Sequence, residues 1–423
     1  MKVAWFTHRY HPCLGGAETY GRAIVRRLVA EGHAVDVFTS DAHDLWYFNN
    51  PRRKRLEAPA ESLVDGARVR RFAIRHYPMQ RYFGRLLSYA PHWPTRCRFA
   101  SYMPILPGID RVRGDYDAVF GVGFPFTVFS YAALRTARAA GAPLVLTPFL
   151  HLATPGDPVN RAYTKPHQIR LLKEADLVVV QTDLEADAVR TWGLDDDRVF
   201  KLGMAVEHGD VTGGSAARFR RDYNIPEGRR VVGHLACLDL NKGTVDLLES
   251  VAHLNQSRGN KPVQLVLAGT SSPDFERYLA ASPHRDADWL TLIRPLPIDG
   301  RPDFYAALDV FAMPSRTDSF GIVFLEAWAN TLPVVAAAAG GVPDVVQDGK
   351  TGLLVPFGDV PRLAEALARF VDDPALAAMV GLAGRARVAR GFTWDAKYQT
   401  LRDRTRAVMP RRPIARTRLA EAS

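Results

Sequence analysis

The sequence predicts an α/β fold made of two doubly wound domains joined by one linker. The chain has 423 residues, 47% of them hydrophobic, which suffices for two domains that each bury a core. Short apolar runs alternate with amphipathic helical segments along most of its length. The alternation stops in a polar, glycine-rich segment at 207–217 and begins again after it.

The first half begins with a strand, a helix and a second strand, at residues 2–7, 17–31 and 34–39. Only Gly32 and His33 separate the helix from the second strand, and so short a connection favours a right-handed βαβ unit with parallel strands. Continuous apolar runs, typical of parallel strands buried on both faces, follow further along the chain. We expect these strands at 117–121, 143–149, 176–181 and 198–202.

The second half shows the same alternation, although its sequence does not repeat the first. Strands are expected at 230–235, 263–268, 289–293, 309–313 and 333–337. Helices are expected near 243–258, 302–308, 320–329 and 360–371, with a last one from Trp394 to about residue 408. We therefore predict a first domain at 1–206, a second domain at 207–390, a terminal helix at 391–409 and a flexible tail at 410–423.

Positive charge is concentrated in an arginine-rich insertion within the first domain, at about 44–113. The chain carries 55 Lys and Arg against 45 Asp and Glu, and the insertion also contains many aromatic residues, including Trp46, Tyr82, Phe83 and Tyr89. Such a surface attracts anionic membranes and lipid-linked molecules. Packing of the same side chains against the first domain is the alternative. Nucleic acid is not expected as a partner, because no nucleic-acid-binding motif accompanies the charge.

The cysteine and hydropathy patterns favour a cytoplasmic protein, with a peripheral position on the inner membrane face as the further expectation. Cys13, Cys97 and Cys237 are odd in number and far apart, which is typical of a reduced compartment. The opening apolar run is too short for a signal-peptide core. No stretch reaches the roughly 18–20 apolar residues of a membrane-spanning helix.

Two loops that follow predicted strands carry residues suited to bind phosphate. Ligands of open α/β sheets bind beyond the carboxyl ends of the strands, where such loops meet helices. Gly15 and Gly16 stand directly before the first helix, where free N–H groups can face an anion; an ordinary helix-entry turn is the alternative. Lys242 stands before the helix at 243–258, where its charge can neutralise a diphosphate.

A third loop adds two carboxylates. Asp318 lies in the loop after a predicted strand, and Glu326 lies about two turns into the helix that follows. Gly321 lets the amides at the helix start approach a phosphate. A carboxylate such as Glu326 can bind a pair of neighbouring hydroxyls, as on ribose. A solvated acidic pair is the alternative, which the apolar neighbours of Glu326 disfavour.

Together these motifs resemble the retaining glycosyltransferases of family 4. The resemblance also rests on Gly340 to Val346, on Asp348 to Val355, on Gly15-Gly16-Ala17-Glu18, on Glu31-Gly32-His33-Ala34-Val35, on Ala175 to Val179 and on Phe392-Thr393-Trp394. It covers most of the chain except about residues 44–113. It implies the GT-B fold, in which two Rossmann-like domains face each other across a cleft and the terminal helix packs back on the first domain.

The resemblance implies a role for each site residue. His151 would lie near the reacting sugar carbon, Lys242 would hold the donor diphosphate, and Asp318 would take sugar hydroxyls. Donor binding would also involve Gly15, Gly16, Phe320, Gly321, Ile322, Val323 and Glu326. Family members usually have Glu in place of Asp318 and Arg in place of Cys237. The second departure matters more, because a thiol cannot replace a guanidinium charge.

The implied reaction moves a hexose-type sugar from a UDP- or GDP-linked donor to a glycan or lipid-linked acceptor, in cell-surface polysaccharide or glycolipid synthesis. No second carboxylate is placed as an obvious nucleophile, so catalysis would depend on positioning and electrostatic stabilisation. We expect no metal ion and no cofactor besides the nucleotide sugar. The alternatives are a non-catalytic relative that binds sugar nucleotide or glycan, which Cys237 would favour, and a nucleotide-sugar epimerase.

Overall fold

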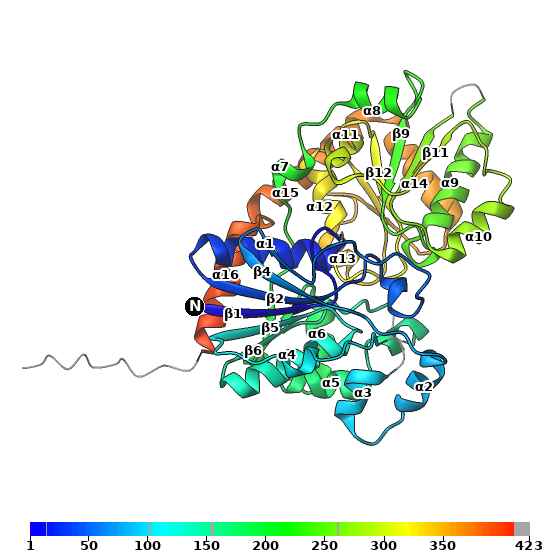
Figure 1. Ribbon diagram of the computed structural model, residues 1–423. Helices are drawn as coiled ribbons and strands as arrows, with labels where there is room; N and C mark the ends of the chain where they lie inside the picture. Colours follow the sequence, from blue (N-terminus) through cyan, green and yellow to red (C-terminus); the bar gives the residue numbers. More distant parts are fainter. Residues whose placement is uncertain (14, 101–102, 154–155, 260–261, 410–423) are drawn as a thin grey trace, which may run out of the picture.

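The structure, a computed structural model, has two lobes, each built around a largely parallel β-sheet with helices against it (Figure 1). It describes residues 1–13, 15–100, 103–153, 156–259 and 262–409. The tail predicted at 410–423 lies outside the described residues. The doubly wound α/β fold expected from the sequence is confirmed in both lobes.

The first sheet has the strand order β3-β4-β2-β1-β5-β6-β7-β8, and only the β3–β4 pair is antiparallel. Its strands are β1 Lys2–Thr7, β2 Ala34–Ser40, β3 Glu61–Val64, β4 Ala67–Phe72, β5 Ala118–Val122, β6 Leu144–Thr147, β7 Leu177–Val180 and β8 Val199–Lys201. All but β3 and β4 were expected, within two residues at each end. In β4 the exposed Arg68 and Arg70 alternate with buried apolar residues, so the sequence there has no continuous apolar run.

The second sheet has the order β11-β10-β9-β12-β13-β14, and all its pairs are parallel. Its strands are β9 Val231–Leu235, β10 Gln264–Ala268, β11 Leu290–Ile293, β12 Val310–Met313, β13 Val334–Ala337 and β14 Leu353–Val355. The five expected strands are confirmed, and β14 is additional. Because β9 and β12 are central neighbours, the loops that follow them leave the sheet side by side.

Adjacent residues of β1 show that the first sheet is covered on both faces. Trp5 and Phe6 are both fully buried but belong to different apolar clusters. Successive side chains of a strand point to opposite faces, so each face has its own core. Trp5 stacks on Phe120 of β5 at 5.1 Å between ring centroids. Continuous apolar runs in the sequence therefore mark strands buried on both faces, as expected.

Helices connect the strands in both lobes. In the first lobe they are α1 Gly16–Ala30, α2 Gln80–Leu87, α3 Trp93–Phe99, α4 Thr127–Ala140, α5 Pro166–Lys173 and α6 Asp183–Thr191. Those that follow are α7 His208–Val211, α8 Ala216–Asp222, α9 Thr244–Gln256, α10 Pro273–Ala281, α11 Arg301–Ala306, α12 Ile322–Ala329, α13 Val342–Val345, α14 Val360–Asp372, α15 Pro374–Gly391 and α16 Trp394–Ala407. The segment predicted as an irregular linker, 207–217, contains the one-turn helix α7.

The last helix, α16, packs back on the first lobe, as the sequence led us to expect (Figure 1). The Tyr398 hydroxyl donates a hydrogen bond to Glu31 at 2.9 Å, and Arg402 pairs with the same carboxylate at 2.8 Å. Glu31 directly follows α1, so these contacts attach the end of the chain to its first helix.

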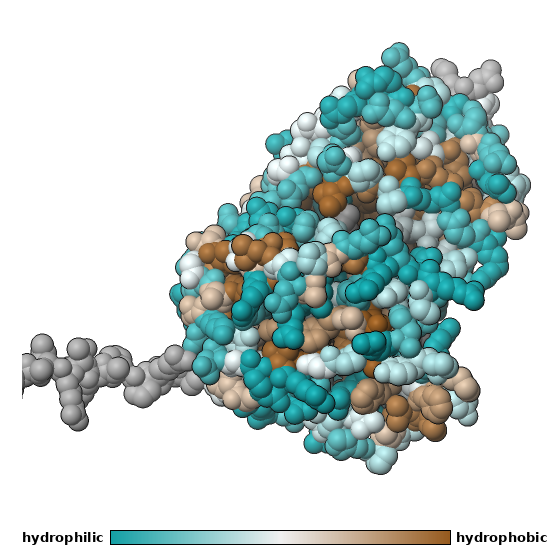
Figure 2. Space-filling model, in the orientation of Figure 1, coloured by the Kyte–Doolittle hydropathy of each residue, from teal (hydrophilic) through white to brown (hydrophobic). Residues whose placement is uncertain are grey.

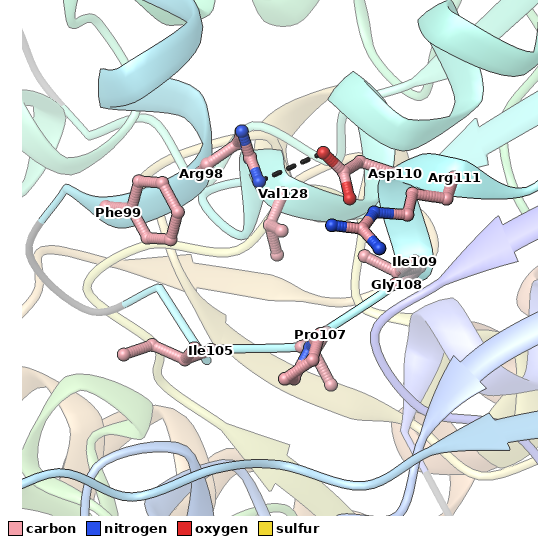
Figure 3. A pocket seen from close by; sticks show the side chains of 10 residues that line it. Arg98, Phe99, Ile105, Pro107, Gly108, Ile109, Asp110, Arg111 and Val128 are labelled. Carbon is pink, nitrogen blue, oxygen red and sulfur yellow. Dashed lines mark ion pairs between the residues drawn. The ribbon is translucent and has the colours of Figure 1, made fainter.

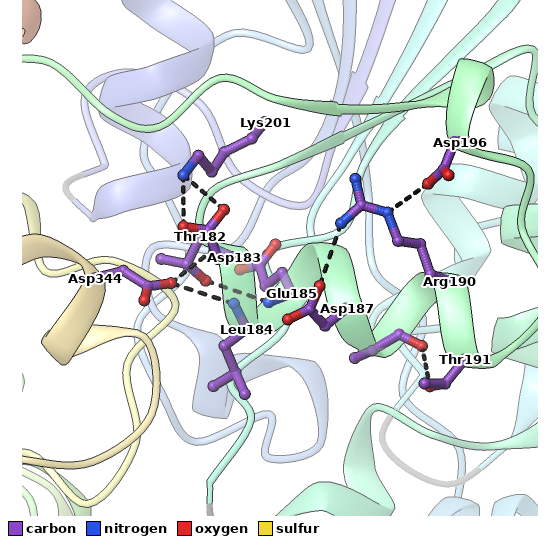
Figure 4. Close-up of polar contacts among 11 residues, drawn as sticks. Thr182, Asp183, Leu184, Glu185, Asp187, Arg190, Thr191, Asp196, Lys201 and Asp344 are labelled. Carbon is purple, nitrogen blue, oxygen red and sulfur yellow. Dashed lines mark hydrogen bonds and ion pairs between the residues drawn. The ribbon is translucent and has the colours of Figure 1, made fainter.

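The carboxyl ends of the two sheets face each other, and loops from both are in contact there. The Thr317 hydroxyl, after β12, donates to the Leu152 carbonyl, after β6, at 2.9 Å. Asp344 of α13 accepts hydrogen bonds from the N–H groups of Asp183 and Leu184, at 2.7 and 3.2 Å, and so caps α6 of the other lobe (Figure 4). Ligand-binding loops of both sheets therefore meet at one junction.

Candidate active site

A buried histidine orders the loop that carries Lys242. His234 lies in β9, and its Nδ1 is 2.8 Å from the Ala312 carbonyl of β12, so Nδ1 carries the proton. Burial lowers the pKa of His234 to about 4, and the neutral ring accepts from the Thr244 hydroxyl at Nε2, at 3.1 Å. The Thr244 oxygen in turn accepts from the Asp239 N–H at 3.2 Å. The start of α9 and the loop before it are thereby tied to the sheet.

The Lys242 loop lies directly against the loop that carries Asp318. Gly243 has φ 67°, and a Cβ there would be 2.1 Å from the Pro314 carbonyl oxygen, so only glycine permits this approach. The Arg316 N–H donates to the Asn241 carbonyl at 2.8 Å. Lys242 Nζ donates to Asp318 Oδ2 at 2.7 Å, and both side chains are largely buried. The structure therefore brings these two predicted residues together.

His151 completes this group from the first lobe. It follows β6, is half-buried, and lies 5.6 Å from the Tyr163 ring between centroids. Burial, reinforced by the charge of Lys242, lowers the pKa of His151 to about 4, while Asp318 acts in the opposite direction. Burial also opposes ionisation of Asp318, but Lys242 and His151 outweigh it and hold the pKa of that carboxyl below its usual value. His151, Lys242 and Asp318 therefore form one cluster across the junction, which we call the junction cluster.

Glu326 lies in the same segment as Asp318, inside α12, and is only 3% exposed. Its two carboxylate oxygens accept from the Tyr305 hydroxyl at 2.6 Å and from Arg301 at 3.2 Å. Sequence reasoning did not find Tyr305 or Arg301. In the sequence these two residues are marked only by their place in the helix before β12. In the structure their side chains reach from α11 to Glu326 of α12.

The predicted amide donors lie at the start of α12. Gly321 is in the left-handed region, with φ 82°, and helix α12 begins at Ile322. The N–H groups of Ile322 and Val323 belong to the first turn, where amides have no partner within the helix. The Phe320 N–H instead donates to Asp318 Oδ1 at 3.3 Å. The Phe320 amide therefore orients the Asp318 carboxylate.

The glycine loop before α1 is open at one residue and filled at the other. A Cβ on Gly16 would meet no atom within 4 Å, whereas one on Gly15 would be 2.3 Å from Glu18 Oε2. Burial opposes ionisation of Glu18, but Arg9 at 2.6 Å and His8 at 3.3 Å lower its pKa to about 2. The backbone at Gly16 is therefore accessible above a buried carboxylate.

Two further points concern metal ions and a cavity in the first lobe. Within the described part of the chain, no group of three or more His, Cys, Asp or Glu side chains is placed to hold a metal ion. A cavity of about 290 Å³ lies in the first lobe, lined by Arg98, Asp110 and mostly apolar neighbours, with those two side chains paired at 3.0 Å (Figure 3). None of the predicted site residues lines it.

Two family models match successive parts of the chain. The Glycosyl transferase 4-like domain matches residues 15–203, and Glycosyl transferases group 1 matches residues 215–387. The first match contains the glycine loop and His151, and the second contains Lys242, Asp318 and Glu326. Together the two models cover most of both lobes.

Individual proteins show the same likeness. A D-inositol 3-phosphate glycosyltransferase from Kribbella flavida is 29% identical over 402 residues, covering 91% of this chain and 89% of the relative. The solved structure of sucrose-phosphate synthase from Thermosynechococcus elongatus superposes with a TM-score of 0.73 at 22% identity, covering 96% and 98% of the two chains. The Anabaena protein HepE, solved in complex with UDP-glucose, gives 0.71 at 19% identity, covering 96% and 100%.

Two facing α/β lobes with loops from both sheets meeting at one site are the architecture of the GT-B fold. The family models and the full-length relatives agree with this class. The chain belongs to the GT4-type glycosyltransferases, and it is an enzyme of that kind. The alternatives of an epimerase and of a non-catalytic relative are not favoured.

Proposed function

We propose that the protein moves a hexose-type sugar from a UDP- or GDP-linked donor to a glycan or lipid-linked acceptor, with retention of anomeric configuration. The observation that carries the proposal is the junction cluster, in which His151 from one lobe meets the Lys242–Asp318 pair of the other. A cation, a carboxylate and a neutral imidazole at one junction suit a donor with a charged diphosphate and a polar sugar. The complex of HepE with UDP-glucose supports a nucleotide-sugar donor.

In this proposal each residue has a separate task. Lys242 and the amides of Ile322 and Val323 stabilise the charge that develops on the leaving diphosphate. Asp318 accepts hydrogen bonds from sugar hydroxyls, and Glu326 accepts them from ribose. The bond between the anomeric carbon and the diphosphate oxygen breaks, the acceptor oxygen bonds to that carbon on the same face, and the acceptor proton passes to the leaving diphosphate.

The neutral state of His151 fits this role. With a pKa near 4, the ring carries no charge at neutral pH, so it can donate or accept a hydrogen bond beside the sugar without repelling Lys242. We propose that the His151 ring holds the sugar hydroxyls in place. It also keeps the carbonyl groups of its own loop near the reacting carbon. Metal chemistry is not required in this scheme, because Lys242 and the helix amides supply the positive charge.

We also propose that α2 meets an anionic membrane surface at the inner face, where lipid-linked acceptors are presented. The exposed fractions of Tyr82, Phe83 and Leu86 are 64%, 52% and 62%, and Tyr89 just beyond the helix is 76% exposed. Figure 2 shows this apolar patch on the lower lobe. The exposed Arg81 and Arg85 lie among these residues, so apolar and basic groups share one surface. No helix within the described residues is both long and apolar enough to cross a bilayer.

The proposed reaction is tested in two stages. A thermal-shift screen against UDP, GDP and ADP sugars identifies the donor, and we expect a UDP or GDP sugar to raise Tm. Mass spectrometry then follows transfer to candidate acceptors, and NMR of the product reads its anomeric configuration. We expect an α-linked donor to give an α-linked product, and activity to survive EDTA. An inverted product, or activity lost in EDTA and restored by manganese, would contradict the proposal.

A further inference from the structure

One position of the second lobe carries a thiol where a cation would suit a bound diphosphate. Cys237 follows β9, five residues before Lys242, at the position where the family that this chain resembles usually has arginine. It is half-buried. Burial and Asp239 raise the pKa of the thiol, so Cys237 stays neutral and supplies no charge to a ligand.

An arginine of the first lobe lies at the glycine loop before α1. Arg9 follows β1, and its Nη2 would be 3.4 Å from a Cβ placed on Gly15, so the guanidinium lies against the glycine loop before α1. Nη1 donates to the His43 carbonyl at 3.0 Å and Nη2 to Glu18 at 2.6 Å. These contacts fix the guanidinium beside Gly15, one residue before the open backbone of Gly16.

The charge of Arg9 also reaches the Cys237 position across the junction. The charges of both Lys242 and Arg9 act on the Cys237 thiol and oppose the rise in its pKa. Positive charge from both lobes therefore acts on the Cys237 position. The Arg9 side chain is 12% exposed and that of Glu18 only 4%, so the cation is the more accessible member of its ion pair.

We propose that Arg9 is a donor-binding residue that supplies, from the first lobe, the guanidinium charge that Cys237 does not supply from the second. The inference rests on the proposed function, because it places a nucleotide diphosphate between the glycine loop and Lys242. A guanidinium presents several N–H groups and suits phosphate better than a single amine does. Since Arg9 belongs to the other lobe, full diphosphate binding requires both lobes in contact.

The test is a rescue experiment on donor-product binding. Affinities for UDP and UMP, or for GDP and GMP if the guanine nucleotide binds, are measured for the wild type and for Arg9→Gln, Cys237→Arg and the double variant. We expect Arg9→Gln to weaken diphosphate binding roughly tenfold or more, and monophosphate binding by less than about twofold. Adding Cys237→Arg should restore most of the loss, because it returns a guanidinium to the site.

Glu18→Gln serves as the matched control. It breaks the same ion pair but keeps the cation, so we expect diphosphate affinity within about threefold of wild type. If Arg9→Gln unfolds because Glu18 is left as a buried lone charge, the double variant Arg9→Gln/Glu18→Gln replaces it in every comparison. The Tm of Arg9→Gln decides whether the single or the double variant is used.

The outcomes separate this inference from the proposed function. Unchanged diphosphate affinity without Arg9, equal loss of monophosphate and diphosphate binding, or failure of Cys237→Arg to restore binding would each overturn the role of Arg9 alone. A wild-type protein that binds neither UDP nor GDP would instead remove the proposed function on which the inference rests.

Discussion

The arginine-rich insertion and the junction cluster use positive charge in opposite ways. In the insertion several arginines form ion pairs with aspartates: Arg68 pairs with Asp36 at 2.8 Å, Arg55 with Asp41 at 2.8 Å, and Arg98 with Asp110 at 3.0 Å. The junction cluster has a single lysine, held by loops of one sheet and facing a histidine of the other. A high density of arginine in the sequence thus identifies the insertion, whereas the candidate site is identified by the position of one lysine at the junction of the two lobes.

The insertion itself divides into a packed part and an exposed part. Phe48 is fully buried and Tyr47 nearly so, whereas α2 presents Tyr82 and Phe83 to the outside. Packing against the first domain is therefore confirmed for Tyr47 and Phe48, whereas for the exposed aromatic residues of α2 the membrane surface stays a proposal. Tyr102, another aromatic of this region, lies outside the described residues. The difference between a tightly held cluster and an exposed helix leads to four tests.

The largest effect is expected at Lys242. In Lys242→Ala the cation proposed to stabilise the leaving diphosphate is lost, and Asp318 is left as a buried carboxylate without its partner. We expect kcat/KM to fall roughly 100-fold or more. Lys173→Ala, which removes an exposed lysine from α5, is the matched control and should change kcat/KM less than about twofold. A similar loss in both variants would mean that overall charge, and not the junction cluster, supports activity.

A smaller effect is expected at Glu326. Glu326→Gln keeps the shape of the side chain and an acceptor for the Tyr305 hydroxyl, but it removes the charge that Arg301 and ribose would share. We expect nucleotide affinity to fall roughly tenfold and the free energy of unfolding to fall by about 1–3 kcal/mol. Calorimetric titration and urea unfolding measure the two. Unchanged affinity with lowered stability would assign Glu326 a structural role only.

These two sites also show what the sequence could and could not predict. Strand positions, both lobes and the placement of Lys242 and Asp318 in loops after strands follow from apolar runs and from the rule that strand ends carry ligands. The pairing of the two loops depends on the strand order, in which β9 and β12 are neighbours. The partners of Glu326 could not be predicted, because α11 and α12 are brought together by packing and not by a motif. The same holds for His234, whose two hydrogen bonds order the Lys242 loop. Strand β4 was missed because arginines interrupt its apolar pattern, and β3 was missed because it is a four-residue strand without a buried apolar face.

The exposed helix should matter for membranes and not for chemistry. In Tyr82→Ser/Phe83→Ser two large exposed side chains are lost, and we expect binding to anionic vesicles to fall roughly fivefold to tenfold. Turnover of a water-soluble acceptor should stay within about twofold of wild type. Leu63→Ser, which removes an apolar side chain that is 75% exposed on β3, is the control for general surface hydrophobicity. Equal vesicle binding by wild type and the double variant would contradict the proposed membrane surface.

The smallest effect is expected from pH. His151 has a pKa near 4, so it loses its proton as pH rises through about 4 and is already neutral at pH 5.5. Its protonation state is therefore constant between pH 5.5 and 8, and kcat/KM should show no inflection from this residue in that range. His253 of α9 is exposed and lies outside the junction cluster, so His253→Asn should leave the profile unchanged. An inflection near pH 6.5 that disappears in His151→Asn but persists in His253→Asn would show that the ring titrates in water, outside the junction cluster. The flat profile is thus expected only if the loops of both lobes hold His151 against Lys242 in solution.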